Sequence, residues 1–236
     1  MSTLILLRHG QSQWNLLKRF TGWADIDLTE VGEAEAVRGG ERLKAEGLEI
    51  DRAFTSLLTR AIRTAILALT AADQIWIPMI KDWRLNERHY GDLTGRDHAE
   101  MIARHGEAQV RIWRRSYDVP PPPLARDSAY DFSRDRRYAG LDLPASESLK
   151  MTLERVLPFW EGSIAPALGA GETVLVAAHG NSLRAIAKHL FAVSDADITG
   201  LEIPTGNPLV ISLDGALKPT AARYLDADRA HPLPPI

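Results

Sequence analysis

The 236-residue chain contains no cysteine. It can therefore form no disulfide, use no thiolate nucleophile and bind no zinc ion or iron–sulfur cluster through sulfur. A chain of this length buries roughly 70–75% of its unfolded surface, so a hydrophobic core can stabilise it without cross-links or a bound metal. The absence of cysteine is typical of a reducing compartment, and we expect a cytoplasmic protein.

An excess of positive charge and long apolar runs are also lacking. The net charge is −3, whereas general nucleic-acid binders are usually basic, so we expect no nucleic-acid partner. The longest apolar stretches, such as residues 4–7 and 75–80, are far shorter than the ~20 residues of a membrane span. No charged segment precedes the first of them, so neither a signal peptide nor a membrane partner is indicated.

Short apolar runs alternate with helical patterns along the chain. Runs with β-branched residues predict buried strands at residues 3–7, 52–55, 75–80, 173–178 and 209–213. Apolar residues at helical spacing predict helices at residues 27 or 29 to about 46, 58–69, 101–112 and 149–164. This alternation indicates an α/β fold of three layers, in which a mostly parallel sheet has helices on both faces.

Three details of the helical patterns can be compared with a structure. Gly39 and Gly40 weaken the prediction of the first helix. Ser146 is expected to cap the last helix, with Glu147 in its first turn. Pro158 lies inside that helix and should kink it.

Residues 88–144 interrupt the alternation. They contain one helical pattern, a run of prolines at 120–123 and a charged loop with aromatic residues. We interpret them as an insertion over one edge of the sheet, within a single domain spanning residues 1–236, and the insertion is long enough to be functional. Residues 225–236 contain three prolines and are expected to form a mobile tail.

Two predicted strands end in the same short motif. The first runs into His9-Gly10, with Ser12 two residues later, and the fourth runs into His179-Gly180, with Ser182 two residues later. In open α/β sheets, ligands bind beyond the carboxyl ends of the strands. The two histidines are therefore expected to lie side by side there, and a glycine after each lets the backbone approach a ligand.

Cations and hydrogen-bond donors follow the same strand ends: Arg8, Asn15, Arg19, Thr21, Gly22, Ser56, Arg60, Arg114 and Arg115. The planar fork of an arginine can hold two oxygens of a phosphate or carboxylate, and the amides at a helix start attract anions. Such a gathering in a chain of negative net charge predicts a pocket for a phosphorylated small molecule.

Histidine is a competent nucleophile toward phosphorus, and a phosphohistidine splits one difficult transfer into two easier ones. The second histidine and the arginines would stabilise the charge that spreads in the transition state. Glu87, which follows the third predicted strand, is the candidate proton donor and acceptor. The sequence contains no nucleotide-binding glycine motif and no His-Glu-x-x-His zinc motif, so no metal site is predicted.

These motifs resemble those of a known family. The pair Arg8-His9-Gly10 and His179-Gly180 resembles the histidine phosphatase superfamily. Within it, the cofactor-dependent phosphoglycerate mutases of bacterial type are the closer resemblance, which extends over about residues 4–224 and rests on the strings RHGQSQWNLLKRFTG, TSLLTRAIRT, DWRLNERHYGDLTG, QVRIWRR, AAHGNSLRA and IPTGNPLV.

The resemblance implies a glycolytic and gluconeogenic isomerase that interconverts 3-phosphoglycerate and 2-phosphoglycerate, primed by 2,3-bisphosphoglycerate and needing no metal. It implies that His9 is the phosphorylated nucleophile, His179 its transition-state partner and Glu87 the acid/base, assisted by Arg8 and Arg60. Because relatives are commonly dimers or tetramers, a homo-oligomer is expected. Together with neighbouring residues of the motifs, the predicted binding set is Arg8, Gly10, Ser12, Asn15, Arg19, Thr21, Gly22, Ser56, Arg60, Glu87, Arg88, His89, Tyr90, His98, Arg114, Arg115, Gly180 and Asn181.

His98 departs from the family pattern, because relatives usually carry a substrate-contacting lysine there. An unperturbed histidine with a pKa of ~6.5 is mostly neutral at pH 7.5, and a dense anion nearby would raise its pKa. We therefore expect apparent substrate affinity to strengthen as the pH falls from about 8 toward 6.5. In the alternative, His98 points to solvent and Arg96 or Arg88 fills the gap.

Two other functions stay open at this point. A phosphatase on the same fold would let water attack the phosphohistidine, although the insertion with Arg114 and Arg115 should exclude water. A catalytically inactive relative would only bind a phosphorylated metabolite or a protein partner. The presence of His9, Glu87 and His179 in one chain argues against that reading.

We predict that a metal chelator leaves the phosphoryl-transfer activity unchanged and that vanadate inhibits it. Five-coordinate vanadate mimics the transferring phosphoryl group, so its inhibition constant should lie at least about 100-fold below the substrate KM. Initial rates with EDTA and with graded vanadate check both statements. Activity that disappears in EDTA and returns with manganese would contradict the prediction.

Overall fold

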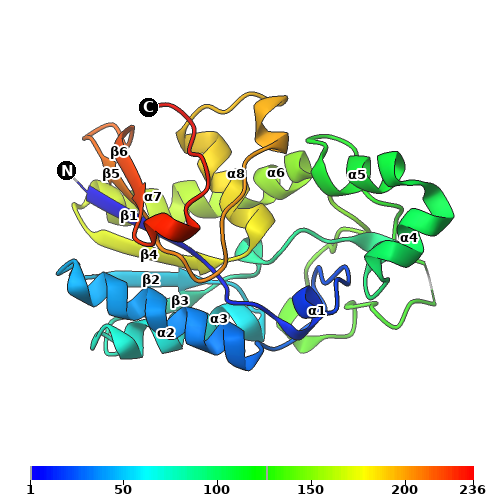
Figure 1. The fold of residues 1–236 in the computed structure, drawn as a ribbon, viewed down its shortest axis with the longest axis horizontal. Helices are drawn as coiled ribbons and strands as arrows, with labels where there is room; N and C mark the ends of the chain where they lie inside the picture. The colour runs from blue at the N-terminus through cyan, green and yellow to red at the C-terminus, as the bar shows by residue number, and fades with distance from the viewer. Residues whose placement is uncertain (1, 126) are drawn as a thin grey trace.

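A computed structural model describes residues 2–125 and 127–236 of the chain. Its centre is a six-stranded sheet in the order β3-β2-β4-β1-β5-β6 (Figure 1). The strands are β1 (Ser2–Arg8), β2 (Arg52–Thr55), β3 (Met79–Lys81), β4 (Thr173–Ala178), β5 (Leu209–Leu213) and β6 (Pro219–Tyr224). The four strands from β3 to β1 are parallel, and β5 pairs antiparallel with both β1 and β6. The predicted α/β fold with a mostly parallel sheet is confirmed.

Helices cover both faces of this sheet, with α2 and α3 on one side and α6, α7 and α8 on the other (Figure 1). The helices are α1 (Gln13–Leu16), α2 (Glu30–Ala45), α3 (Thr59–Ala71), α4 (His98–His105), α5 (Glu107–Arg115), α6 (Leu149–Phe159), α7 (Ala165–Gly169) and α8 (Gly180–Leu190). In the part of the chain that the structure describes, no helix has the length and apolar character needed to cross a membrane.

The apolar run of β1 is continuous because both of its faces are buried. Leu4 and Leu6 pack in the cluster that includes α6 and α8, whereas Ile5 and Leu7 pack with residues of α2 and α3. Successive side chains of a strand point to opposite faces, so a parallel strand between two helical layers needs apolar residues at every position. This requirement explains why the central strands could be predicted from short apolar runs.

Two predicted element boundaries are wrong. The third strand begins at Met79, and the preceding Ile75 and Trp76 are exposed. Ser148, not Ser146, caps α6, because the Ser148 side chain accepts a hydrogen bond from the amide of Met151. Glu147 consequently lies before the helix instead of in its first turn.

Two predicted helices are interrupted. The pattern at 101–112 forms two helices, because Gly106 adopts φ 82°, a left-handed conformation that ends α4 and begins α5. In the last helical pattern, Pro158 is followed by a π-helical turn over Trp160–Ile164 and then by α7. A proline removes one helical hydrogen bond, and the wider turn absorbs the resulting misfit.

The insertion at 88–144 lies beyond the carboxyl ends of the parallel strands, where α4 and α5 flank the rim of the sheet (Figure 1). In the C-terminal segment, Arg229 donates hydrogen bonds to the Glu35 carboxylate at 2.9 Å and to the Thr205 carbonyl at 2.7 Å. Leu233 packs against the larger core cluster. These contacts connect the tail to the domain, and the mobility of residues 225–236 stays a prediction.

Gly39 and Gly40 lie inside α2 at the places where other chain segments come closest. A Cβ on Gly40 would lie 2.1 Å from the carbonyl oxygen of Ala68 in α3, and one on Gly39 would lie 3.0 Å from the carbonyl oxygen of Gly206. The two glycines therefore permit α2 to pack closely against its neighbours. The stability gained from this packing outweighs the low helix propensity of glycine.

We predict that Gly40→Ala lowers the free energy of unfolding by about 1–3 kcal/mol, because α2 and α3 must move apart to admit the methyl group. Urea denaturation measures the change. Gly162→Ala is the matched control, since a Cβ there meets no atom within 4 Å. A Gly40→Ala protein as stable as the Gly162→Ala protein would contradict this account of the packing.

Candidate active site

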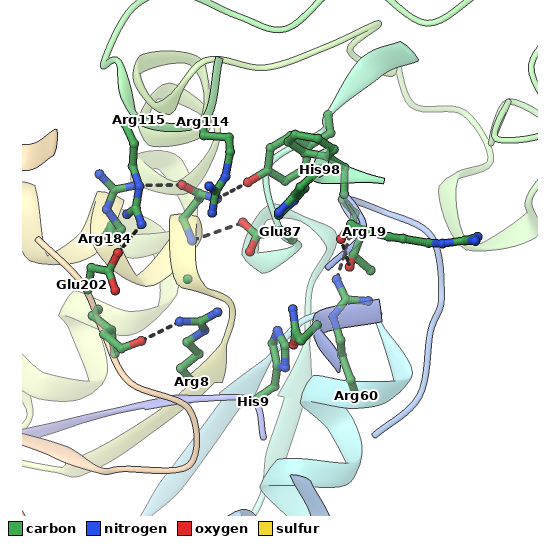
Figure 2. A pocket seen from close by; sticks show the side chains of 18 residues that line it. Arg8, His9, Arg19, Arg60, Glu87, His98, Arg114, Arg115, Arg184 and Glu202 are labelled. Carbon is green, nitrogen blue, oxygen red and sulfur yellow. Dashed lines mark hydrogen bonds and ion pairs between the residues drawn. The ribbon is translucent and has the colours of Figure 1, made fainter. Parts of the chain in front are cut away.

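A cavity of about 260 Å³ opens at the carboxyl ends of β1, β2 and β4 (Figure 2). Arginine side chains approach it from several elements, with His9 at its floor and Glu87 near its centre (Figure 2). The lining residues are Arg8, His9, Asn15, Arg19, Phe20, Thr21, Gly22, Arg60, Glu87, Tyr90, His98, Arg114, Arg115, Gly180, Asn181, Arg184, Glu202 and Ile203. Most of the residues predicted from the sequence therefore line one cavity.

His9 follows β1 directly and is 3% exposed. Its Nδ1 lies 2.7 Å from the carbonyl oxygen of Gly10. Because a carbonyl can only accept, Nδ1 carries the proton and Nε2 keeps its lone pair. Burial, followed by the positive charges of Arg60 and Arg8, holds the pKa of His9 well below its ordinary value. The neutral ring with a free Nε2 has the form that a nucleophile requires.

His179 follows β4 and precedes α8, and its ring centroid lies 5.0 Å from that of His9. Nε2 of His179 lies 2.8 Å from Oγ of Ser56. That hydroxyl already accepts the amide hydrogen of Leu58 at 3.1 Å, so its own hydrogen is available for Nε2. Burial, followed by the charge of Arg60, lowers the pKa of His179 well below its ordinary value. We assign the Ser56 hydroxyl as the donor to Nε2, and this assignment puts the ring proton of His179 on Nδ1.

Arg60, on α3, is 1% exposed and fixes the loop that follows the first strand. It donates to the carbonyls of Ala24 at 2.9 Å and Gly22 at 2.8 Å. Burial is the main cause that lowers the pKa of Arg60 to about 10, against the opposing effect of the negative Glu87. The guanidinium therefore stays charged at neutral pH and places a fixed positive charge beside both histidines.

Several buried donors lack an acceptor among the described residues: Nε of Arg8, Arg60 and Arg184, which line the cavity, and Nδ1 of His179 in its assigned tautomer. His179 is not a lining residue and lies buried beside His9. Leaving such groups unpaired is costly, and most buried polar atoms in proteins have partners. An anion with several oxygens would satisfy them, so the residues fit a phosphorylated ligand. Among the described residues, no group of three or more potential ligand side chains is placed to hold a metal ion.

Glu87 lies beyond a short 3₁₀ turn, Trp83–Leu85, instead of directly after β3. Its side chain is largely buried, and Oε1 accepts hydrogen bonds from the amides of Arg88 at 2.7 Å and Asn181 at 3.1 Å. The second carboxylate of the cavity, Glu202, is ion-paired with Arg115. Glu87 is therefore the carboxylate placed to exchange a proton with a ligand.

Three small residues predicted to bind do not line the cavity and support it from behind. The Gly10 amide donates to Oγ1 of Thr64 at 3.1 Å. Ser12 caps α1 and exchanges hydrogen bonds with Asn15. Ser56 contacts His179, as described above. Each follows a strand as expected, but its polar atoms form hydrogen bonds with other groups of the protein instead of with a ligand.

Arg88 and His89 also lie behind the cavity, unlike their neighbours Glu87 and Tyr90. The Arg88 guanidinium stacks 4.7 Å from the centre of the Tyr90 ring and donates to the carbonyl of Arg114 at 3.0 Å. Burial lowers the pKa of His89 to about 4. His89 therefore packs as a neutral ring, and its Nδ1 accepts the Gly91 amide hydrogen at 3.0 Å.

Four lining residues were not predicted: Phe20, Arg184, Glu202 and Ile203. Arg184 lies three residues after Asn181 on α8 and donates to the Asn181 side-chain oxygen at 2.9 Å. Helical spacing could have found it, because residues three apart share a helix face. Glu202 and Ile203 come from the irregular segment before β5, where no sequence pattern indicates a position.

His98 lines the cavity, and in the protein without a ligand its pKa is lowered; the rise expected beside a bound anion stays a prediction. Its ring packs edge-on against Phe20, with the ring centroids 4.2 Å apart. Burial, followed by the positive charge of Arg114, lowers the pKa of His98 to about 4. The ring is therefore neutral from pH 8 to pH 6.5, and the cavity has one cation fewer than a lysine at this position would provide.

Comparison with known proteins places the chain in a family. The model of the histidine phosphatase superfamily (branch 1) matches residues 4–220. The fold agrees with that of a mycobacterial glucosyl-3-phosphoglycerate phosphatase solved with VO3, with a TM-score of 0.73 and 23% identity over 95% of this chain and 97% of the other. At this low identity the likeness shows the fold alone.

Curated relatives are much more similar. The 2,3-bisphosphoglycerate-dependent phosphoglycerate mutase of Caulobacter sp. (strain K31) is 69% identical over 236 residues, and that of Hyphomonas neptunium (strain ATCC 15444) is 61% identical over 236 residues, in each case covering 100% of both chains. The chain therefore belongs to the histidine phosphatase superfamily and, within it, to the 2,3-bisphosphoglycerate-dependent phosphoglycerate mutases. The resemblance drawn from the sequence is confirmed.

We predict that His98→Lys lowers the KM for an anionic substrate by about 2- to 5-fold, the effect of one added ion pair that is partly exposed. The pKa of His98 is about 4 in the free protein, so even a rise of about two units beside a bound anion would leave the ring mostly neutral as the pH falls from about 8 to 6.5. The two curves of KM against pH should then run parallel over that range, with the variant below. Curves that converge near pH 6.5 would show that His98 titrates there, contrary to this prediction.

Proposed function

We propose that this chain interconverts 3-phosphoglycerate and 2-phosphoglycerate through a phosphohistidine on His9. The observation that carries the proposal is a pair of neutral histidine rings 5.0 Å apart, of which His9 lines an arginine-rich cavity and His179 lies fully buried beside it. The named activity of relatives that are 61–69% identical over the whole chain supports it. The ligand would be a phosphorylated small molecule.

His9 supplies the nucleophile. Its Nε2 lone pair attacks phosphorus while the bond from phosphorus to the substrate oxygen breaks, and the Nδ1 hydrogen bond to the Gly10 carbonyl keeps the ring oriented. As Nε2 acquires a bond, the ring becomes positively charged, and the Gly10 carbonyl stabilises that charge. The lowered pKa of His9 ensures that the free ring is unprotonated before the attack.

Glu87 moves the proton. When a substrate oxygen leaves phosphorus, the Glu87 carboxyl gives it a proton, and when a hydroxyl attacks the phosphohistidine, the carboxylate accepts the proton that the hydroxyl loses. The two amides that bind Oε1 hold this carboxyl in place during both half-reactions.

The donors that lack acceptors hold the oxygens of the phosphoryl group. The His179 ring lies 5.0 Å from that of His9, and the charges of Arg8 and Arg60 act on His9, so these groups lie near the place where charge develops in the transition state. Arg114 and Arg115 line the cavity from the insertion and would bind the second anionic group of the substrate. When bound, 2,3-bisphosphoglycerate supplies the phosphoryl group that primes His9.

The proposed reaction is a step of glycolysis and gluconeogenesis. We therefore propose a cytoplasmic location for the enzyme. A homo-oligomer stays a prediction. Water must be kept from the phosphohistidine, and α4 and α5 of the insertion contribute His98, Arg114 and Arg115 to the cavity lining, where they would help to exclude it.

We predict that His9→Ala lowers the mutase rate below about a hundredth of the wild-type rate, because a covalent nucleophile is lost. The assay follows 3-phosphoglycerate with and without 2,3-bisphosphoglycerate, and acid-quench labelling with peptide mapping locates the phosphoryl group.

Glu87→Gln should keep the fold and lower the rate by about 10²–10⁴-fold. Fast turnover by His9→Ala would contradict the mechanism, and stoichiometric phosphate release by the wild type would indicate a phosphatase.

A further inference from the structure

Glu87 is carried by a segment that lacks regular secondary structure. Residues 86–90 follow the 3₁₀ turn Trp83–Leu85 and belong to no helix or strand. Proton transfer requires a carboxyl group held close to its target, and a displacement of about 1 Å can cost 10²-fold in rate. The contacts that fix this segment therefore bear on the reaction.

Arg155, on α6, binds backbone carbonyls of Glu87 and of the residues before it. Its NH1 donates to the carbonyls of Arg84 at 2.7 Å and Asn86 at 3.2 Å. Its NH2 donates to the carbonyls of Asn86 and Glu87, both at 3.3 Å. One buried guanidinium, 5% exposed, thus holds the carbonyls of Arg84, Asn86 and Glu87 together.

Glu147 completes this arrangement from the other side. Its carboxylate is 2% exposed and forms a forked ion pair with Arg155, with Nε–Oε1 at 2.6 Å and NH2–Oε2 at 2.8 Å. Oε2 also accepts the amide hydrogen of His89 at 2.8 Å, and the Glu147 amide donates to the His89 carbonyl at 2.8 Å. The pair therefore fixes the chain immediately before and after Glu87.

Trp23 contributes a third contact. Its Nε1 donates to the Glu87 carbonyl at 2.6 Å, and the Arg155 guanidinium lies 5.6 Å from the centre of the Trp23 ring. The three residues Trp23, Glu147 and Arg155 are absent from the cavity lining. They reach the ligand only through the backbone of Glu87 and its neighbours.

Stability alone does not account for such a pair. Two charges lose their hydration on burial, and a buried ion pair can often be replaced by apolar residues with little loss of stability. Here the N–H groups of Arg155 that do not bind Glu147 all donate to backbone carbonyls of the segment that carries Glu87. A neutral apolar pair would fill the space but leave those carbonyls without their donor.

We propose that the Glu147–Arg155 pair is a positioning device that holds the Glu87 carboxyl where it can exchange a proton with the substrate. The proposal rests on the proposed function, in which Glu87 is the acid and base. Arg155 and Glu147 are positioning residues, because they act through the backbone of residues 84–89.

Arg155→Lys is the test variant. Lysine keeps the positive charge, including the charge of Arg155 that helps to lower the pKa of His179, but it cannot reach the carboxylate and the carbonyls with one planar fork. Arg52→Lys is the matched control, because Arg52 makes a forked pair with Glu172, at 2.9 Å for both contacts, at the start of β2 and outside the cavity lining.

The readout is the dependence of the rate on the leaving group. A sugar-acid alkoxide leaving phosphorus needs a proton from Glu87, whereas the p-nitrophenolate of p-nitrophenyl phosphate leaves without one. With enzyme in excess, the nitrophenolate released in one turnover measures His9 phosphorylation when no acid is required. The kcat and KM of the mutase reaction measure the complete reaction, in which the acid is required.

For Arg155→Lys we expect mutase kcat to fall by about 10- to 100-fold, with KM and the p-nitrophenyl phosphate rate within about twofold of wild type, because the anion contacts are unchanged. Arg52→Lys should change none of the three. An equal loss in both reactions would show a merely structural role and overturn the proposal, and so would an unchanged kcat.

A second variant covers the case in which Arg155→Lys fails to fold. Glu147→Gln with Arg155→Met removes both charges together, so no buried charge is left unpaired, and the same selective loss of kcat is expected. Glu87→Gln tests the underlying function separately. If that variant does not lose the alkoxide reaction selectively, then Glu87 is not the acid and the proposed function fails, whatever the result for Arg155.

Discussion

The register of the parallel pair β1–β4 is the constraint on which the site depends. Arg8 pairs with Ala178, and the His9 amide donates to the Ala178 carbonyl at 2.9 Å. Both strands therefore end at the same level, and the residue that follows each end is a histidine. A slip of one residue would move each side chain to the opposite face of the sheet, so the buried apolar faces of both strands fix the 5.0 Å separation of the rings.

Burial and positive charge act together on these two rings. Desolvation and the neighbouring arginines both disfavour a protonated histidine, so the free protein keeps His9 and His179 neutral. The same positive charges favour an incoming phosphate and stabilise the charge of a transferring phosphoryl group. One arrangement of arginines thus keeps the nucleophile unprotonated and binds the group that it attacks.

Sequence reasoning succeeded where one physical requirement decides the residue types. The central strands are buried on both faces, and their apolar runs predicted β2, β4 and β5 with the bounds that the structure has. The repeated His-Gly at two strand ends likewise placed His9 and His179 at one rim. Strand β6 was missed because it begins at Pro219 and buries only its last residue, Tyr224, so it lacks the apolar signal.

Other features depended on contacts between distant segments. Two serines flank Glu147, and the choice of Ser148 as the helix cap follows from the burial of Glu147 against Arg155, which lies eight residues further along the chain. Gly40 is unfavourable for a helix by propensity alone, and only the position of the Ala68 carbonyl explains why no side chain can stand there. Glu202 and Ile203 reach the cavity from an irregular segment whose path depends on the folded core.

The central claim is that the Nδ1 hydrogen bond of His9 to the Gly10 carbonyl leaves Nε2 as the nucleophile. The most direct test identifies the phosphorylated ring nitrogen. Phosphorus NMR of the protein labelled with 2,3-bisphosphoglycerate, compared with the two authentic phosphohistidine isomers, distinguishes them. The account predicts phosphorus on Nε2 of His9, and a resonance from the Nδ1 isomer, or a label on another residue, would contradict it.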